Sequence, residues 1–443
     1  MSRAHRHRQI QVVSIAWLIS AMAGCGGGSV IDAPSGPVAP IDTTKPPVVQ
    51  RGRLSVHVGI DPADAALASS LGITPTGLTV RLLRPLSSDP PRTAIVNSAG
   101  IVQFDSLLGA SYQISVDRVL SDVERSRLSD ADRDVGILAA GTTVNFSPPL
   151  NETQLSLIAS RRGSLVISEM YGYLGTGGGV LYNWGSYLEV YNNTDTTSYL
   201  DGAFIGMTWG GMHLGNITDK PCATFNVESR LDSTSLWLAI IQAFPGGGHD
   251  YPIAAGEAKV IALDASNHAP LAPNQFDLSG ASFEQHGSEA DVDNPFVPDM
   301  TIVRGGTGAL GRGYPIRWGQ SFAILSAKTA IPNETSNIAG LSGSGYVAYR
   351  IDRSNVLDVF SIDPTPALAA ATASYQEGLR SCQPFLSSVF ERDVAQIGNY
   401  YLPQAISRKS LGRRSNGVEI LQRTRTSSRD FEYAEPLRRS LRK

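Results

Sequence analysis

Cysteine, charge and long apolar runs are all scarce in this chain of 443 residues. The 3 cysteines are too few for a disulfide-rich scaffold, and their spacing does not suggest a metal site. Charged residues make up only 17%, and the formal net charge of -3 gives no reason to expect nucleic acid as a partner. Glycine (44) and proline (26) are abundant instead, and many turns with few charged helix surfaces are typical of an extracytoplasmic, mostly β protein.

The start of the chain predicts export. Basic residues precede an apolar run from Ile10 to Ala23, which is shorter than the ~20 residues that a membrane span requires. The run ends in Met22-Ala23-Gly24-Cys25, which resembles the bacterial lipobox. The resemblance implies that residues 1–24 are a lipoprotein signal peptide and that Cys25 is lipidated and becomes the new N-terminus. The alternative is an ordinary secretory signal with a chance cysteine.

Residues 25–50 predict a disordered tether. They are rich in Gly, Ser and Pro, and such a composition cannot bury a core. Gly26 follows the cysteine where an aspartate would resemble an inner-membrane retention signal, which favours a cell-envelope address at the outer membrane, on its periplasmic or its surface side. With Cys25 acylated, Cys222 and Cys382 remain, either as a disulfide or as two buried free thiols.

Residues 51–160 predict a first β-sandwich domain. Short runs with period-two alternation are separated by turn residues, namely 53–58, 78–83, 100–104, 112–116, 143–146 and 154–158. The spacing of Gly100, Phe104, Gly109 and Tyr112 resembles the carboxypeptidase-regulatory or transthyretin-like modules of envelope proteins. The charged segment 121–134 predicts a surface loop or a short helix.

Residues 161–435 predict a second β domain. Ile167-Ser168-Glu169, the strand from Tyr187 to Asn193, and the turn from Leu200 to Gly202 together resemble the opening of a lamin-tail-type domain. With the segments that follow, up to Phe431, the chain resembles a lamin-tail-related family of uncharacterised bacterial lipoproteins, domain of unknown function 4876. The resemblance implies an Ig-like or lamin-tail-like sandwich that serves interactions and not catalysis.

The rest of the expected second domain consists of further strands, one segment that could be helical, and a basic C-terminal stretch. Strands are predicted at 236–241, 321–325, 345–349 and 356–360, the first of them buried on both faces, and a turn followed by a strand is predicted at 251–262. Residues 371–398 could hold a helix. Arginines outnumber acids from Arg408 onward, which predicts a solvated basic stretch or a membrane-proximal face in preference to a binding patch, with a basic tail at 436–443.

The leading candidate site is an acidic loop. Asp291, Asp293 and Asp299 are candidate metal ligands, and Glu284 and Glu289 extend them into a candidate binding loop. Ca²⁺ prefers oxygen ligands from loops of this kind, but no calcium-loop spacing is matched, so a solvated loop is the competing interpretation. The sequence predicts no other cofactor and no catalytic residue.

Other motifs are more simply explained as structure. The glycine-rich stretches 175–179 and 246–248 lack the residues of a phosphate loop and predict hairpin loops. Gly343-Ser344-Gly345 lacks the spacing of a nucleophile elbow and predicts a turn. His213, His249, His268 and His286 have no metal-binding spacing.

The sequence therefore predicts a membrane-anchored envelope lipoprotein with a non-catalytic binding, adhesion or structural role. Its expected partners are the membrane, through the lipid anchor, and envelope proteins or a surface polymer. The alternatives are a hydrolase or carbohydrate-processing protein that uses the acidic loop, and a passive spacer. An enzyme should show a deep pocket with convergent carboxylates of shifted pKa, and a binding module should show exposed patches.

Overall fold

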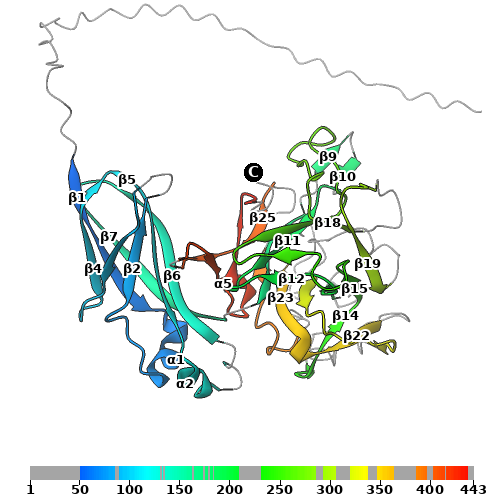
Figure 1. The fold of residues 1–443 in the computed structure, drawn as a ribbon, viewed down its shortest axis with the longest axis horizontal. Coiled ribbons are helices and arrows are strands. Elements are labelled where there is room, and N and C mark those ends of the chain that lie inside the picture. Colours follow the sequence, from blue (N-terminus) through cyan, green and yellow to red (C-terminus); the bar gives the residue numbers. More distant parts are fainter. Residues whose placement is uncertain are drawn as a thin grey trace, which may run out of the picture. The chain divides into compact units, whose positions relative to one another are not determined.

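The computed structural model has a compact unit that spans Gln50–Lys443 (Figure 1). It describes residues 50–84, 89–129, 132, 135–161, 164–172, 175–177, 180–182, 184–208, 231–285, 293–305, 320–337, 347–363, 386–396, 403–414 and 416–437. The predicted signal peptide, the tether up to residue 49, Cys25, Cys222, Cys382 and the tail at 438–443 lie outside these residues. Within the described part of the chain, no helix is long and apolar enough to cross a membrane.

The first part of the second unit is a seven-stranded sheet of order β3-β2-β5-β6-β7-β1-β4. Its strands are β1 (Arg51–Ile60), β2 (Thr79–Leu83), β3 (Arg92–Ile95), β4 (Ile101–Leu108), β5 (Ala110–Val119), β6 (Val135–Phe146) and β7 (Leu150–Arg161). All neighbours are antiparallel except β1 and β7, which run parallel. Alternate side chains such as Val80, Leu82, Val102 and Phe104 are buried, as the period-two pattern predicts.

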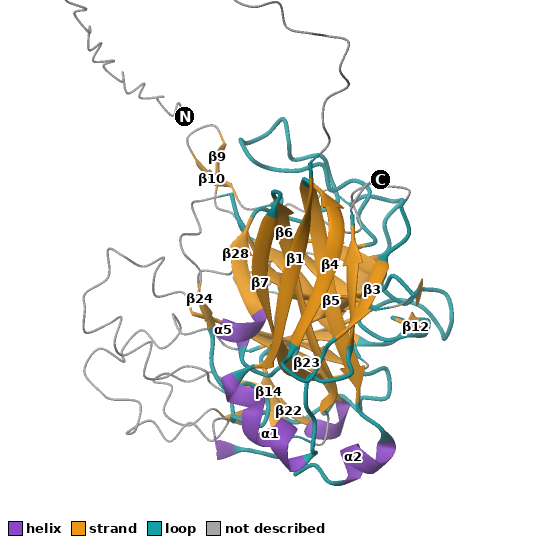
Figure 2. Ribbon diagram, turned by 90° about the vertical axis from the view of Figure 1, so that its left-hand side faces the viewer, coloured by secondary structure: helices purple, strands orange, loops and turns teal. Residues whose placement is uncertain are grey.

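Short helices lie at one end of this sheet (Figure 2). They are η1 (Pro62–Asp64), α1 (Ala65–Ser70) and α2 (Asp122–Ser126). Ser121 and Glu124 form a capping box at the start of α2, which explains why the charged segment becomes helical there. The prediction of a surface loop or short helix at 121–134 is confirmed for α2.

The second part is built on a twelve-stranded sheet of order β24-β23-β20-β13-β15-β19-β18-β17-β11-β8-β25-β28. Its strands are β8 (Leu165–Tyr171), β11 (Tyr187–Asn192), β13 (Phe204–Met207), β15 (Ile240–Ala243), β17 (Ala258–Ala262), β18 (Phe283–Gln285), β19 (Asp299–Arg304), β20 (Ser321–Leu325), β23 (Val356–Asp363), β24 (Ala395–Gln396), β25 (Ala405–Arg408) and β28 (Phe431–Ala434). Phe360 of β23 and Phe431 of β28 lie near opposite ends of this order, yet their ring centroids are 4.2 Å apart. The sheet therefore curls around its own core.

Smaller elements complete the structure. They are β9 (Gly175–Gly177) with β10 (Val180–Tyr182), β12 (Ser198–Tyr199) with β16 (Pro252–Ile253), β14 (Ser235–Leu238) with β22 (Val347–Asp352) and β21 (Ser336–Asn337), β26 (Ser410–Arg413) with β27 (Glu419–Leu421), the turn η6 (Arg353–Asn355) and the helix α5 (Ser427–Asp430). The predicted mostly β class is confirmed, and the two regions predicted as sandwiches are each built on one large curled sheet.

One predicted strand is wrong in its extent. Residues 236–241 are not a single strand, because β14 ends at Leu238 and β15 begins at Ile240 in a different sheet. The backbone N–H of Ala239, between them, donates to the carbonyl of Met207 at 2.8 Å. The continuous apolar run reflects burial of both short strands and of the bend.

The β26–β27 hairpin joins the two sheets. Leu411 and Ile420 of the hairpin form one apolar cluster with Ile137 and Ala139 of β6. Gly412 has a φ of +98°, and a Cβ there would lie 2.4 Å from the Ser115 Cβ. Only a glycine therefore fits the backbone and the close approach to the first sheet at this position.

Candidate functional site

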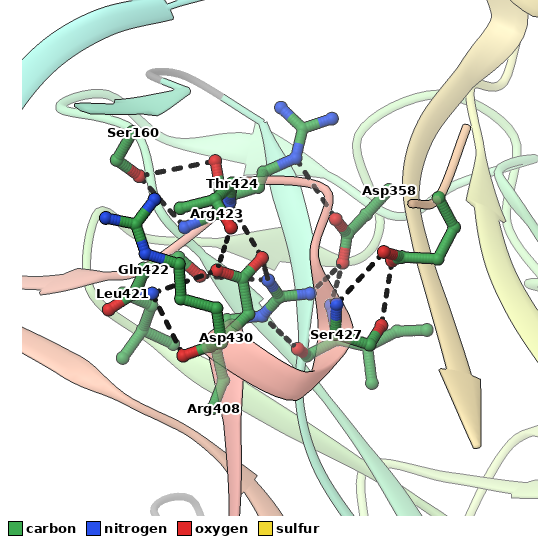
Figure 3. Close-up of polar contacts among 12 residues, drawn as sticks. Ser160, Asp358, Arg408, Leu421, Gln422, Arg423, Thr424, Ser427 and Asp430 are labelled. Atoms are coloured by element: carbon green, nitrogen blue, oxygen red, sulfur yellow. Dashed lines mark hydrogen bonds and ion pairs between the residues drawn. The ribbon is translucent and has the colours of Figure 1, made fainter. Parts of the chain in front are cut away.

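A buried arginine, Arg408, belongs to a set of polar contacts in the second part of the molecule (Figure 3). Arg408, at the end of β25, is 1% exposed, and its Nη2 donates to Oδ2 of Asp358 in β23 at 2.6 Å. Its Nε and Nη1 donate to the carbonyls of Ile167 and Gln422 at 2.7 and 2.9 Å. The charge is thus paired and the guanidinium is hydrogen-bonded on each nitrogen, which is the condition under which a buried ion can be stable.

A second carboxylate completes this centre. Asp430, at the end of α5, lies 3.5 Å from Nη1 of Arg408. It accepts hydrogen bonds from the backbone N–H and the hydroxyl of Thr424, both at 2.7 Å. Burial raises the pKa of Asp430, while Arg408 and the hydrogen bonds from Thr424 act in the opposite direction.

Arg423 extends the network toward the first sheet. Its Nε donates to Oδ1 of Asp358 at 3.1 Å, and its backbone N–H donates to the hydroxyl of Ser160 in β7 at 2.9 Å. The backbone N–H of Arg161 donates in turn to the Arg423 carbonyl at 3.0 Å. We name the set Asp358, Arg408, Arg423 and Asp430 the ion network.

A buried glutamate lies beside the ion network. Glu391 is 1% exposed and accepts hydrogen bonds from the backbone N–H and the hydroxyl of Ser427, at 2.9 and 2.7 Å. Burial, with a further contribution from the negative charge of Asp430, raises the pKa of Glu391 to about 8. Glu391 therefore carries a proton at neutral pH.

A cavity of about 790 Å³ opens over the ion network. Asp358, Arg423 and Asp430 belong to its lining, and so do Arg125 of α2 and Gly136 of β6 from the first sheet. The turn η6 contributes Arg353 and Ser354, and Val389 and Phe390 form an apolar part of the wall. Both sheets thus contribute to one polar cavity, whose size is in the range of ligand sites in proteins.

The predicted acidic loop is only partly described. Glu284, Asp293 and Asp299 each offer a carboxylate oxygen within 4.8 Å of the other two, an arrangement that could hold a hard cation. Glu284 is buried and accepts hydrogen bonds from the backbone N–H of Ala265 and of Asn294, at 2.7 and 3.2 Å. Glu289 and Asp291 lie outside the described residues, so their part in such a site stays a prediction.

The Ser-Glu motif of β8 serves packing. Glu169 is fully buried and accepts hydrogen bonds from the hydroxyls of Tyr187 and Ser407, at 2.6 and 2.5 Å. Ser168 donates to Oε1 of the buried Glu189 at 2.8 Å. These contacts fasten β8 to β11 and β25, so the motif residues hold the sheet together.

The turn motif and the second glycine stretch are one structural unit. Gly202 has a φ of +66°, as expected for the tight turn after Leu200. The preceding Asp201 accepts hydrogen bonds from the backbone N–H groups of Gly248, Asp250 and Tyr251, at 3.2, 2.7 and 2.9 Å. Although burial opposes it, these bonds lower the pKa of Asp201. The predicted hairpin loop at 246–248 is therefore held by a carboxylate.

Two of the four histidines are described. His268 is fully buried, with Nδ1 2.6 Å from the Tyr182 hydroxyl and Nε2 2.9 Å from the Asp264 carbonyl. His249 packs edge-on against Tyr199, with ring centroids 4.4 Å apart. Both therefore have structural contacts. His213 and His286, Gly178–Gly179 and Gly343–Gly345 lie outside the described residues.

The ion network was not predicted from the sequence, because the arginines that form it lie in a stretch that was expected to be solvated. The prediction that the stretch from Arg408 onward is solvated is wrong for Arg408 and for Arg414, which is 8% exposed. Arg408 lies at the end of β25 and pairs with Asp358 of β23 and Asp430 of α5. Arg414 follows β26 and pairs with Asp195. Apolar residues such as Ile406, Leu411 and Ile420 are interspersed with the arginines of 405–423, unlike in a uniformly charged tail. This pattern could have indicated that some of these arginines are buried, but not which carboxylates they meet.

The fold and the cavity together define a mostly β protein with a charged cavity between two sheets. No family model matches the sequence. No curated protein matches it.

Among solved structures, a DUF4876 family protein from Bacteroides thetaiotaomicron is similar, with 19% identity and a TM-score of 0.49, over 88% of this chain and 97% of that one. It bears the name of the family that the sequence motifs resemble. A candidate carbohydrate-binding protein from Pseudomonas aeruginosa is similar over 24% of this chain and 89% of its own, with 15% identity and a TM-score of 0.16. A DUF3823 family protein from Parabacteroides merdae is similar over 36% of this chain and 67% of its own, with 9% identity and a TM-score of 0.17.

Proposed function

We propose that this chain is a membrane-anchored envelope lipoprotein that binds a ligand, without transforming it, in the cavity over the ion network. The single observation that carries the proposal is that the carboxylates at the cavity floor are already paired. Asp358 accepts hydrogen bonds from Arg408 and Arg423, and Asp430 accepts two from Thr424. A general acid or base needs an exchangeable proton within reach of the substrate, whereas these groups are 3% and 2% exposed.

The anchor and the address are parts of the same proposal. Cys25 with its three preceding residues supports lipidation, and the glycine- and proline-rich residues 25–50 support a tether that holds the binding part away from an outer membrane. Envelope proteins or a surface polymer are then the accessible partners. The Cys25→Ser chain is expected to leave the membrane fraction, and its retention there would contradict the anchor.

Binding is tested by capture from envelope extract. The full chain in detergent should retain an envelope component, and a chain altered in the cavity lining should retain less of it. Equal capture by both chains would show that the cavity is not the binding site. No capture by the unaltered chain would contradict the binding function.

A hydrolase remains the second candidate, because three carboxylates converge at Glu284, Asp293 and Asp299. Retaining glycosidases use two carboxyl groups about 5 to 5.5 Å apart, a spacing of the same order. Glu284 is fully buried and already accepts hydrogen bonds from two backbone N–H groups, so its carboxylate is poorly accessible to a substrate. Release of reducing ends from envelope polysaccharide by the unaltered chain, lost on Asp293→Asn, would favour this alternative over binding alone.

A further inference from the structure

We propose that the cavity over the ion network takes an anionic, hydroxyl-bearing ligand, a sugar acid or a sugar phosphate, and that Arg353 is its principal charged contact. The inference rests on the proposed binding function of the same cavity and names its ligand class.

The charge balance of the lining supports an anion. The lining contains three aspartates and four arginines. Asp358 and Asp430 are paired with Arg408, which lies beneath the lining, and Asp358 also pairs with Arg423. The third, Asp352, accepts from the backbone N–H of Ser354 at 2.8 Å and from its hydroxyl at 2.5 Å. Asp352 keeps its negative charge, because both of its partners are neutral, and Arg125 pairs with Asp122. With Arg408 and Asp122 counted, five arginines meet four aspartates, and the excess of positive charge favours an anionic ligand.

The backbone of Arg353 is fixed by a hydrogen bond, and its guanidinium is available to a ligand. It is the first residue of η6, and its backbone N–H donates to the Thr234 carbonyl at 2.8 Å. Among the residues that the structure describes, its guanidinium has no hydrogen bond or ion pair. A planar guanidinium with five donors matches a carboxylate or a phosphate, and a fixed backbone reduces the entropy lost on binding.

The remaining lining suits a sugar ring. Ser233, Thr234 and Ser354 belong to the lining, and Val389 and Phe390 offer an apolar surface. The hydroxyls of Thr234 and Ser354 donate to Asp232 and Asp352, and their oxygens can still accept a hydrogen bond from a ligand. Hydroxyl-bearing ligands need such polar partners, and the faces of sugar rings are largely apolar. Acidic peptides are more often bound in grooves or at strand edges than in a cavity between two sheets, so a sugar is the better fit.

The test is isothermal titration of the full chain in detergent with digalacturonate, glucose 6-phosphate, glucose, inorganic phosphate and tetraglutamate. Arg353→Gln is compared with Arg92→Gln, which removes the same charge from an exposed residue of β3 outside the cavity. We expect at least one anionic sugar to bind at least tenfold more tightly than glucose, inorganic phosphate and tetraglutamate. Arg353→Gln should weaken that binding at least tenfold, and Arg92→Gln should leave it unchanged.

The two sugars identify the acidic group. Tighter binding of digalacturonate assigns a carboxylate, and tighter binding of glucose 6-phosphate assigns a phosphate. Equal affinity for glucose, for inorganic phosphate alone or for tetraglutamate would overturn the ligand class, and so would anionic-sugar binding that survives Arg353→Gln with an unchanged circular dichroism melt. If no anionic sugar binds while envelope capture still depends on the cavity, the ligand class fails and the binding function stands. If capture also fails, both are overturned.

Discussion

Arg408 and Asp358 lie 50 residues apart in sequence and 2.6 Å apart between Nη2 and Oδ2, and both are almost completely buried, at 1% and 3% side-chain exposure. The pair joins β25 to β23. Because Asp358 also accepts from Arg423, which bonds Ser160 of the first sheet, the same carboxylate connects the core of the second sheet to the first.

Replacing Arg408 with methionine should lower the free energy of unfolding by about 3 to 5 kcal/mol, because Asp358 and Asp430 then lose the buried guanidinium that compensates their charge. Urea denaturation at neutral pH measures the loss. Arg92→Met, on the exposed face of β3, is the matched control and should change stability by no more than about 0.5 kcal/mol. Similar midpoints for the two variants would show that the buried pairing contributes no net stability.

The strands of both sheets could largely be predicted from alternation, because a half-buried strand must place an apolar side chain at every second residue. The edge strand β3 was missed, since three of its four residues are exposed and no apolar pattern marks it. The ion network could not be predicted, because its partners are brought together by the curl of the sheet and sequence distance says nothing about that. The sequence prediction named all three carboxylates of the acidic cluster, Asp293 and Asp299 as metal ligands and Glu284 as part of the binding loop. It could not assign Glu284 to the ligands, because Glu284 and Asp299 meet through the parallel pairing of β18 and β19.

Glu391 should make the protein less stable in alkali. Its pKa is raised from 4.5 to about 8 in the folded chain, so the folded state binds more protons than the unfolded state between these pH values. The contribution of Glu391 to the free energy of unfolding is fully present below pH 4.5 and is lost as the pH rises to about 8. Stability from this group should fall by roughly 1.4 kcal/mol per pH unit within that window.

Glu391→Gln keeps the uncharged form at every pH and provides the comparison. Urea unfolding of both chains at pH 5.5, 7 and 8.5 should show a steeper decline for the unaltered chain. Parallel stability curves for the two would mean that Glu391 titrates near its ordinary value.

Alanine substitutions at two glycines of the β26–β27 hairpin distinguish the stability cost of backbone strain from the cost of lost packing between the sheets. Gly412 and Gly417 both have positive φ, +98° and +83°, but a Cβ at Gly412 would meet the Ser115 Cβ at 2.4 Å, whereas at Gly417 nothing lies within 4 Å. Either substitution by alanine should cost about 1 to 2 kcal/mol of strain. Gly412→Ala should cost more, because it also pushes the hairpin off β5, and thermal unfolding should show the difference. Equal losses would mean that the hairpin does not pack closely there.

Ca²⁺ should raise the melting temperature of the chain if the carboxylates of Glu284, Asp293 and Asp299 share a cation, because a ligand that binds only the folded state stabilises it. Asp293→Asn together with Asp299→Asn should abolish the increase and leave the melting temperature in chelator little changed. A melting temperature that does not respond to Ca²⁺ in the unaltered chain would leave the trio as a solvated acidic cluster.

The central claim is that the two sheets act as one unit around the cavity, and hydrogen exchange under increasing denaturant tests it most directly. Peptides from β6 and from β23 should lose their slowest-exchanging amides over the same range of urea concentration, and Leu411→Ala should shift both together. Exchange of β6 at a denaturant concentration where β23 stays protected would show two independent bodies, and the cavity could not then be a preformed binding site.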